Sequence, residues 1–492
     1  MEYYAKSKKV QFTSERINEI KKNMKNIEEC LKENLTETDV EILNSSITDI
    51  AEKTEEKQKT LKEHHKDIVT CAEMFFLEYG EYFTEKEKKL VVEACRIHDL
   101  GKVNLVFQAM ICPKLAEKFH IDVRKTSQIP HGFLSAVTIS LDEFDDLSEL
   151  FSDKDFGPFI TAVYYHHDRE DHYNSPAIRK YAEKYYMKQI EEYLNRKIRK
   201  LNCSNLDDLL FRNNVYTGKY IPDSNAWKEY LLIKGLLNKF DYTVSAGYEN
   251  AESAIDLHEK KLVKNIEKFL NGKELRPAQK FMKMNRDKNL IVIAPTGSGK
   301  TEASLLWMNG EKSFYTLPLK VSSNAIYLRI KENYEYKDVA LLHSDAMAVY
   351  LREYNGNEDI GEKYERSKML SQPLTVCTVD QLFRFVYRAL GTEIFAATLK
   401  YSKIILDEIQ AYEPRIIATI IYGLKMIQEM GGKFAIITAT FPPVLKYFME
   451  QYGLVEGKQY IFKDFTGKEY QVEKYPRHKV EIRHSEMNLD EI

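Results

Sequence analysis

The stretch NLIVIAPTGSGKTEASLLW, residues 289–307, decides the fold of the second half of the chain. Its apolar run Leu290–Ile293 predicts a buried strand, a glycine-rich turn follows, and Thr301–Trp307 continues with helical spacing. A strand, a glycine-rich loop and a helix in this order form the setting that a phosphate-binding loop requires. The stretch therefore predicts a nucleotide site.

Four residues of this loop have the chemistry that ATP and Mg²⁺ need. Gly297 and Gly299 let backbone N–H groups close around phosphate oxygens, Lys300 supplies a charge for the β and γ phosphates, and Thr301 offers a hydroxyl to Mg²⁺. The departure is Ala294, where the usual pattern begins with glycine. Helicase-type loops tolerate that substitution, so we expect ATP with Mg²⁺ at this loop.

Length and composition limit the class of protein. A chain of 492 residues predicts two or three domains, and a net charge of −3 excludes a basic nucleic-acid coat. The six cysteines show no CxxC spacing, which favours reduced thiols in a cytosolic protein. The polar start, residues 1–10, and the absence of a run of about 18 apolar residues argue against secretion and a membrane partner.

The first half of the chain carries histidines and acids at the ends or on the apolar faces of predicted helices. Their side chains suit a divalent transition metal such as Mn²⁺, Fe²⁺, Co²⁺ or Ni²⁺, because imidazoles and carboxylates occur there without thiolates. Buried carboxylates are costly unless they are paired or bind a metal. The residues are His64 or His65 in LKEHHKDIV, His98 and Asp99 in RIHDLGK, His131 in IPHG, His166 and His167 in YYHHD, and Asp241 in NKFDYTV.

An adjacent His-Asp pair has a specific use in such a set. The carboxylate of Asp99 can bridge two ions while the imidazole of His98 binds one of them. Two bridged ions activate a water and stabilise the attacking and leaving oxygens of phosphodiester hydrolysis. The alternative, unrelated buried histidines, fits the ordered set less well.

The second half alternates strands with helices, which predicts a parallel sheet covered on both faces. In KIILDEIQ, an apolar strand delivers Asp407 to hold Mg²⁺ and Glu408 to polarise the attacking water. Four further residues lie in segments that resemble motifs of superfamily-two helicases: Gln279 in ELRPAQKFM for adenine, Lys320 in SFYTLPLKVSS for the nucleic-acid backbone, and Thr438 and Thr440 in FAIITATFPP for coupling. Thr378 in LTVCTVDQLF follows another predicted strand, at the edge where ligands bind in such sheets.

Together, a His-Asp hydrolase domain and a helicase-type loop resemble the CRISPR-associated helicase-nuclease that degrades DNA in type I interference systems. The resemblance runs through TLKEHHKDIV, HDLGK, HG..SA, YYHH and LLNKFDYTVSAG, and then through the ATPase motifs. It implies a multidomain protein, with an all-α HD-type metal-dependent nuclease domain followed by an α/β RecA-like domain whose sheet is mainly parallel.

The resemblance also implies roles for single residues. His64, His98, Asp99 and Asp241 would hold one ion, and Asp99, His131, His166 and His167 would hold the other. Lys102 would lie beside the scissile phosphate and act with Asp99 in catalysis. The helix spacing favours His64, although His65 stays open. The implied partners are single-stranded DNA, as the displaced strand of an R-loop, and a guide-RNA surveillance complex in a prokaryotic cytoplasm.

The domain boundaries follow from these motifs. We expect an HD nuclease domain at 1–250 with a charged helical insertion at 12–60, a linker at 251–272, and a first RecA-like domain at 273–492. About fifty residues follow Pro442, and they show no second set of alternating strands and helices. We therefore expect this chain to lack the second motor domain, by truncation or by a natural split, and not to unwind DNA alone.

Two other functions remain open from the sequence. The first is an HD phosphohydrolase that acts on small nucleotides, with the ATPase domain as its regulator. The second is a non-catalytic binding subunit of a split helicase.

Overall fold

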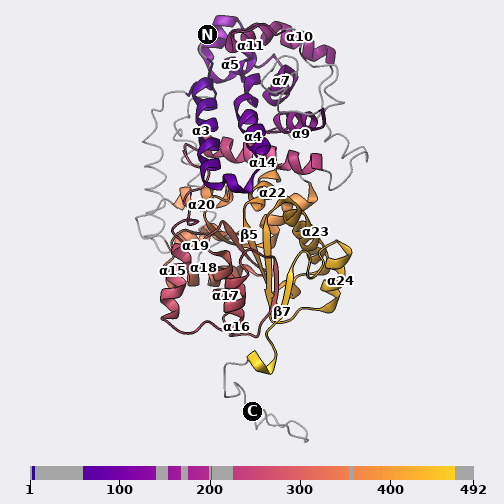
Figure 1. Cartoon of the computed structure of the whole chain (residues 1–492). Coiled ribbons are helices and arrows are strands. Elements are labelled where there is room, and N and C mark those ends of the chain that lie inside the picture. The colour runs from indigo at the N-terminus through magenta and orange to yellow at the C-terminus, as the bar shows by residue number, and fades with distance from the viewer. Residues whose placement is uncertain are drawn as a thin grey trace, which may run out of the picture.

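The computed structural model of the chain describes residues 3–5, 59–139, 153–167, 175–198, 201, 225–353, 360–388 and 391–470. Most of the predicted insertion at 12–60 lies outside these residues. The described part forms a helical module, up to Ser245, and an α/β module, from Lys261 (Figure 1). The predicted fold class, an all-α domain followed by a RecA-like α/β domain, is confirmed.

The helical module is built from amphipathic helices whose apolar faces meet in one core. Helices α3 and α4 both begin with a capping box, in which Thr60 and Thr84 accept hydrogen bonds from the backbone N–H groups of Glu63 and Glu87. The helices of this module are α3 (Leu61–Tyr79), α4 (Glu85–Ile97), α5 (Leu105–Ile111), α6 (Pro113–Phe119), α7 (His131–Thr138), α9 (Asp153–Tyr164), α10 (Ser175–Tyr185), α11 (Met187–Leu194) and α14 (Asn225–Ser245).

The α/β module contains a parallel sheet of seven strands in the order β3-β4-β2-β5-β6-β1-β7. All residues of β2, β3, β4 and β5 are buried, since helices cover both faces of the sheet. The strands are β1 (Leu290–Ile293), β2 (Ser313–Leu317), β3 (Val339–Leu342), β4 (Leu374–Thr378), β5 (Lys403–Asp407), β6 (Lys433–Thr438) and β7 (Ile461–Asp464). Strand β7 was not among the predicted elements, because its four residues end in a lysine and an aspartate.

The helices of the α/β module connect these strands in the pattern that parallel pairing requires. They are α15 (Lys261–Leu270), α16 (Pro277–Met284), α17 (Lys300–Met308), α18 (Lys320–Glu332), α19 (Ala346–Arg352), α20 (Ile360–Lys368), α21 (Val379–Leu382), α22 (Glu393–Lys400), α23 (Pro414–Met430) and α24 (Pro443–Gln451). Across the described ranges, none of the helices is both long and apolar enough to cross a membrane.

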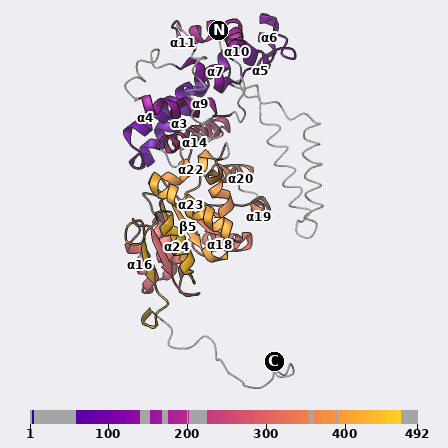
Figure 2. The same ribbon diagram turned by 90° about the vertical axis from the view of Figure 1, so that its right-hand side faces the viewer.

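Helix α14 joins the two modules. It lies between the helical bundle and α22 in both views (Figures 1 and 2), and it packs on α3, α4 and α9 as well as on α22. Gly235 permits this contact, because a Cβ atom there would lie 2.4 Å from the backbone oxygen of Glu393. Beside it, the Lys234 Nζ donates to Glu393 Oε1 at 2.9 Å with both side chains buried.

The range 251–272, predicted as a linker, contains groups that are packed against both modules. Glu252 is buried, and its carboxylate pairs with Lys239 of α14 at 3.0 Å and with Lys312, which precedes β2. The Tyr401 hydroxyl donates to the same carboxylate at 2.8 Å. Removal of one partner from a buried charged network leaves the others unsatisfied, so this segment fixes the two modules to each other.

The packing of α14 on α22 predicts the effect of Gly235→Ala. On helix propensity alone, alanine would stabilise α14 by up to about 1 kcal/mol. We expect the opposite sign, a loss of roughly 1–3 kcal/mol, because the new methyl group meets the backbone oxygen of Glu393 and the Cβ of Ala397. Urea unfolding of the two proteins measures the difference, and a stabilised variant would contradict the close approach of these helices.

Candidate functional site

Seven of the predicted metal ligands come from five elements of the helical module. His64 lies on α3, His98 and Asp99 follow α4, and His131 is the first residue of α7. His166 and His167 follow α9, and Asp241 lies on the last third of α14. Although they span nearly two hundred positions of sequence, their side chains meet in one cluster that is mostly buried.

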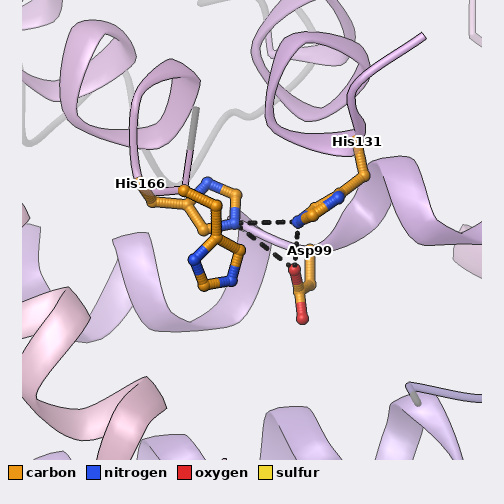
Figure 3. Close-up of side chains that lie close together, drawn as sticks. Asp99, His131 and His166 are labelled. Atoms are coloured by element: carbon orange, nitrogen blue, oxygen red, sulfur yellow. Dashed lines mark hydrogen bonds and ion pairs between the residues drawn. The ribbon is translucent and has the colours of Figure 1, made fainter. Parts of the chain in front are cut away.

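Asp99 contacts imidazoles with both of its carboxylate oxygens. Its Oδ1 lies 3.3 Å and 3.5 Å from the Nε2 atoms of His131 and His166 (Figure 3). Its Oδ2 lies 3.4 Å from the Nε2 atoms of both His64 and His98. Two groups of possible ligands therefore share this carboxylate. They are His64, His98 and Asp99, and Asp99, His131, His166 and His167.

Asp241 contacts one histidine from each of the two ligand groups. Its Oδ1 lies 3.2 Å from His64 Nε2, and its Oδ2 lies 3.1 Å from His167 Nε2. Within the described residues, the buried atoms without a hydrogen-bond partner include both ring nitrogens of His64, His98 Nε2, Asp99 Oδ1 and Asp241 Oδ2. Buried polar atoms without partners are costly, and bound cations would satisfy the ones that face the cluster, His64 Nε2, His98 Nε2, Asp99 Oδ1 and Asp241 Oδ2. The donor set therefore fits a pair of divalent ions.

The rings are oriented for binding by hydrogen bonds to the backbone. His98 Nδ1 lies 3.1 Å from the carbonyl oxygen of Cys95, and His166 Nδ1 lies 2.6 Å from that of Val163. When each Nδ1 donates to its carbonyl, the Nε2 lone pair points into the cluster. This outer contact is the usual way in which proteins select the tautomer of a metal-binding histidine.

Burial and charge set the protonation states that ligands need. Burial lowers the pKa of His98 to about 4 and that of His166 to about 3, and it lowers the pKa of His131 well below the ordinary value. Burial opposes ionisation of Asp99 and Asp241, but the surrounding imidazoles hold both carboxyl pKa values well below their usual range. His98, His131 and His166 are thus neutral near pH 7, and the carboxylates of Asp99 and Asp241 are ionised.

The His64–His65 doublet separates into two environments. Burial acts to lower the pKa of His64, but the carboxylates of Asp99 and Asp241 that it faces raise this pKa above its ordinary value. His65 turns its Nδ1 to the hydroxyl of Tyr193 at 3.1 Å, and burial lowers its pKa to about 4. This geometry favours His64 as the ligand. Tyr193 was not predicted, since nothing in the sequence marks its distant contact with His65.

Lys102 lies beside the cluster on the turn that follows Asp99. Its Nζ is 2.6 Å from Asp99 Oδ2, and its side chain is buried. Ser135 fixes this turn, because its hydroxyl accepts from the Gly101 N–H at 2.8 Å and donates to the His131 carbonyl at 2.9 Å. Ser135 was not predicted as a site residue, although its place four residues after His131 in HG..SA is the signal that would have identified it.

The phosphate loop lies between β1 and α17. Gly297 and Gly299 have φ angles of +77° and +83°, a region in which a side chain is strained. Lys300 forms an ion pair with Glu408, and Thr301 starts the buried face of α17. Gln279 is buried, with its Nε2 3.4 Å from the Gly299 carbonyl, so its amide contacts the loop itself.

Asp407 ends β5 next to this loop. Burial raises its pKa to about 6, whereas a hydrogen bond of 2.8 Å from the Tyr315 hydroxyl and the charge of Lys300 act in the lowering direction. Tyr315 therefore holds the carboxylate that would bind Mg²⁺. Tyr315 was not predicted as a site residue, because a tyrosine in a buried strand usually belongs to the hydrophobic core.

The remaining predicted motor residues lie along the same sheet edge. Thr378 and Thr438 end β4 and β6, and Lys320 begins α18 after β2. The Thr438 hydroxyl contacts Gln410, which also donates to Glu408, and the Thr440 N–H donates to the Thr438 oxygen at 3.2 Å. Lys320 is exposed and pairs with Asp345 at 2.9 Å. The structure thus brings the motor residues to one edge, because parallel strands end on the same side.

The metal-free protein should lose stability as the pH falls from 6.5 towards 4. His98, His131 and His166 stay neutral when folded but take up protons below pH 6.5 when unfolded, so the unfolded state is favoured as the pH falls. His64, with its raised pKa, contributes the opposite slope, but the lowered histidines outnumber it. Urea unfolding over this pH range measures the slope, which His98→Asn should reduce. A flat profile would contradict the buried neutral cluster.

Magnesium-dependent ATP binding should weaken as the pH falls through about 6, because Asp407 must be ionised to hold the cation. Tyr315→Phe removes a hydrogen bond that favours the carboxylate, so we expect the midpoint to move to higher pH. Titration of a fluorescent ATP analogue with Mg²⁺ across this pH range measures both midpoints. An unchanged or lower midpoint in the variant would exclude this role of Tyr315.

Two protein-family models match the chain. Residues 51–224 match the model described as "Cas3, HD domain", and residues 277–448 match the model described as "DEAD/DEAH box helicase". The first match covers all predicted metal ligands except Asp241, and the second covers the phosphate loop and the motor motifs.

Curated relatives agree with these models. The CRISPR-associated nuclease/helicase Cas3 of Methanothermobacter thermautotrophicus is 25% identical over 464 residues, which cover 81% of this chain and 54% of the relative. The CRISPR-associated endonuclease/helicase Cas3 of Escherichia coli is 25% identical over 190 residues, or 33% of this chain and 21% of the relative. The chain thus spans about half the length of the first of these relatives, and a smaller share of the second.

Solved structures show the same fold. The crystal structure of T. fusca Cas3-ATP covers 83% of this chain with a TM-score of 0.56 and 16% identity, and the chain covers 52% of that protein. The ADP form of the same protein has a TM-score of 0.55. With its HD domain followed by a DEAD/DEAH-box helicase domain, the chain belongs to the CRISPR-associated Cas3 nuclease/helicase family.

Proposed function

We propose that the chain is a metal-dependent nuclease that cuts single-stranded DNA, joined to the first motor domain of an ATP-dependent DNA translocase. The observation that carries this proposal is the buried carboxylate of Asp99, which faces imidazoles with both of its oxygens. An isolated structural histidine has no such arrangement. The shared carboxylate is what a two-ion phosphodiesterase needs.

The two groups of ligands divide between the ions. His64, His98, Asp99 and Asp241 would hold one, and Asp99, His131, His166 and His167 would hold the other. The donor atoms are imidazole nitrogens and carboxylate oxygens, without sulfur, and this set favours Mn²⁺, Fe²⁺, Co²⁺ or Ni²⁺. When bound, the ions supply Lewis-acid chemistry for phosphodiester hydrolysis. Asp99 positions both ligand groups, and Lys102 neutralises charge that develops on the phosphate.

The α/β module has the groups that bind and hydrolyse ATP. Lys300 and Thr301 would hold the phosphates and Mg²⁺, Asp407 would be the second protein group on Mg²⁺, and Glu408 would polarise water. Lys300 forms an ion pair with Glu408, so the phosphates of ATP would compete with this carboxylate for the Lys300 ammonium group. The relatives are named nuclease/helicases, which supports the same coupling here.

The substrate and the partner follow from the family. The relatives are CRISPR-associated, and we infer that the chain acts in type I interference on the displaced strand of an R-loop. A guide-RNA surveillance complex would expose that strand. We place this activity in the prokaryotic cytoplasm, where such complexes meet foreign DNA.

Circular single-stranded DNA tests the nuclease without the motor. We expect the purified chain to cut it with Mn²⁺ or Ni²⁺ and without ATP, and Asp99→Ala to lower the rate more than about a hundredfold, because loss of an outer contact alone costs 10–100-fold. The matched control, Lys300→Ala, removes the phosphate-loop charge and should keep the metal-dependent cutting.

Two outcomes would overturn the proposal. Hydrolysis of free nucleotides without cutting of DNA would show a phosphohydrolase instead. Undiminished cutting by Asp99→Ala would show that the cluster is not the nuclease site.

A further inference from the structure

The candidate metal cluster is open along one edge. Among its ligands, His64, His98, Asp99, His166 and Asp241 have side chains that are at most 2% exposed. The side chains of His131 and His167 are 14% and 33% exposed. A substrate must therefore approach the cluster across the edge that these two imidazoles form.

Aromatic rings stand at both ends of that edge. The Phe107 ring lies 5.8 Å from that of His131, the rings of His131 and His167 are 5.4 Å apart, and the Tyr242 ring stacks on His167 at 6.2 Å and 15°. The ring contacts thus run in series from Phe107 through the two exposed ligands to Tyr242. Tyr242 is 36% exposed, and Phe107 is half-buried.

Rigid elements hold the two aromatic residues. The Phe107 N–H donates to Asn104 Oδ1 at 2.9 Å, and the same oxygen accepts from the Tyr181 hydroxyl at 3.0 Å. Tyr242 follows Asp241 on α14, and its ring stacks on the exposed ligand His167. Lys102 adds a positive charge, with its Nζ 5.9 Å from the Phe107 ring.

We propose that Phe107 and Tyr242 stack on nucleobases on either side of the phosphodiester that is cut. This inference rests on the proposed nuclease function and identifies how the site selects its strand. Stacking on aromatic side chains is available to the unpaired bases of a single strand and tolerates any sequence, because every base has a π-face. Bases within a duplex are already stacked and paired, so they do not reach the two rings.

The test compares two strands of equal length and charge. One is an ordinary single-stranded oligonucleotide, and the other carries abasic residues throughout its central tract. Wild-type protein with Mn²⁺ should cut the abasic strand with a KM roughly tenfold higher, as expected from the loss of base stacking. The ratio of the two KM values, abasic strand over ordinary strand, should fall towards one in Tyr242→Leu and Phe107→Leu. Tyr242→Phe and Phe107→Tyr keep a ring, so they should keep the wild-type ratio.

A matched control separates this role from a general loss of aromatic surface. Phe119 also carries a lysine over its ring, Lys118 at 5.4 Å, but it has no ring contact with the cluster in the described part of the chain. Phe119→Leu should therefore keep the wild-type ratio. Metal content of each variant, measured on the purified protein, reports whether the pocket is intact.

The outcomes distinguish the two proposals. Wild-type protein that cuts neither strand would overturn the nuclease function itself. Wild-type protein that cuts both strands with the same KM would overturn the stacking role and leave the nuclease in place, and so would leucine variants that bind metal and keep the wild-type ratio.

Discussion

A fully buried carboxylate, that of Asp99, faces four imidazoles and one ammonium group, and the organisation of the helical module depends on this arrangement. Burial of an ionised acid is unfavourable unless the acid is paired, hydrogen-bonded or bound to a metal. The elements that carry His64, His98, His131 and His166 must therefore converge on one point. These four histidines lie on or next to α3, α4, α7 and α9, and α14 adds Asp241, so the pocket is assembled from five elements.

Helix α14 extends this constraint to the second module. Its Asp241 contacts two histidines of the cluster, while Lys234, Gly235 and Lys239 face the α/β module or the segment before it. The candidate metal cluster and the α/β module thus share one helix, α14. The buried ion pairs Lys234–Glu393 and Lys239–Glu252 hold α14 against α22 and against the segment that joins the modules. The geometry of each site therefore depends on the packing of the other module.

Much of the fold was predictable because its signals are local. The loop with Gly297 and Gly299, the strand that ends at Asp407 and the period of the helices depend on neighbouring residues. Contacts between distant residues were not predictable. The sequence pattern of Tyr315 indicates a core residue, but its hydroxyl donates to Asp407. Tyr193 contacts His65 Nδ1 from a distant helix. The four residues of β7 form a strand by pairing with the edge of β1.

The sequence by itself determined which chemistry is present: imidazoles and acids without thiolates, a phosphate loop, and acids at the end of an apolar strand. These motifs depend on residue types and on short spacings along the chain, and both can be identified in the sequence directly. Only the tertiary structure decided that Asp99 is shared, that His64 faces the cluster while His65 turns away, and that Phe107 and Tyr242 flank its open edge. The reason is physical: the burial and orientation of a side chain are set by elements far away in the sequence, and they exist only once those elements have packed.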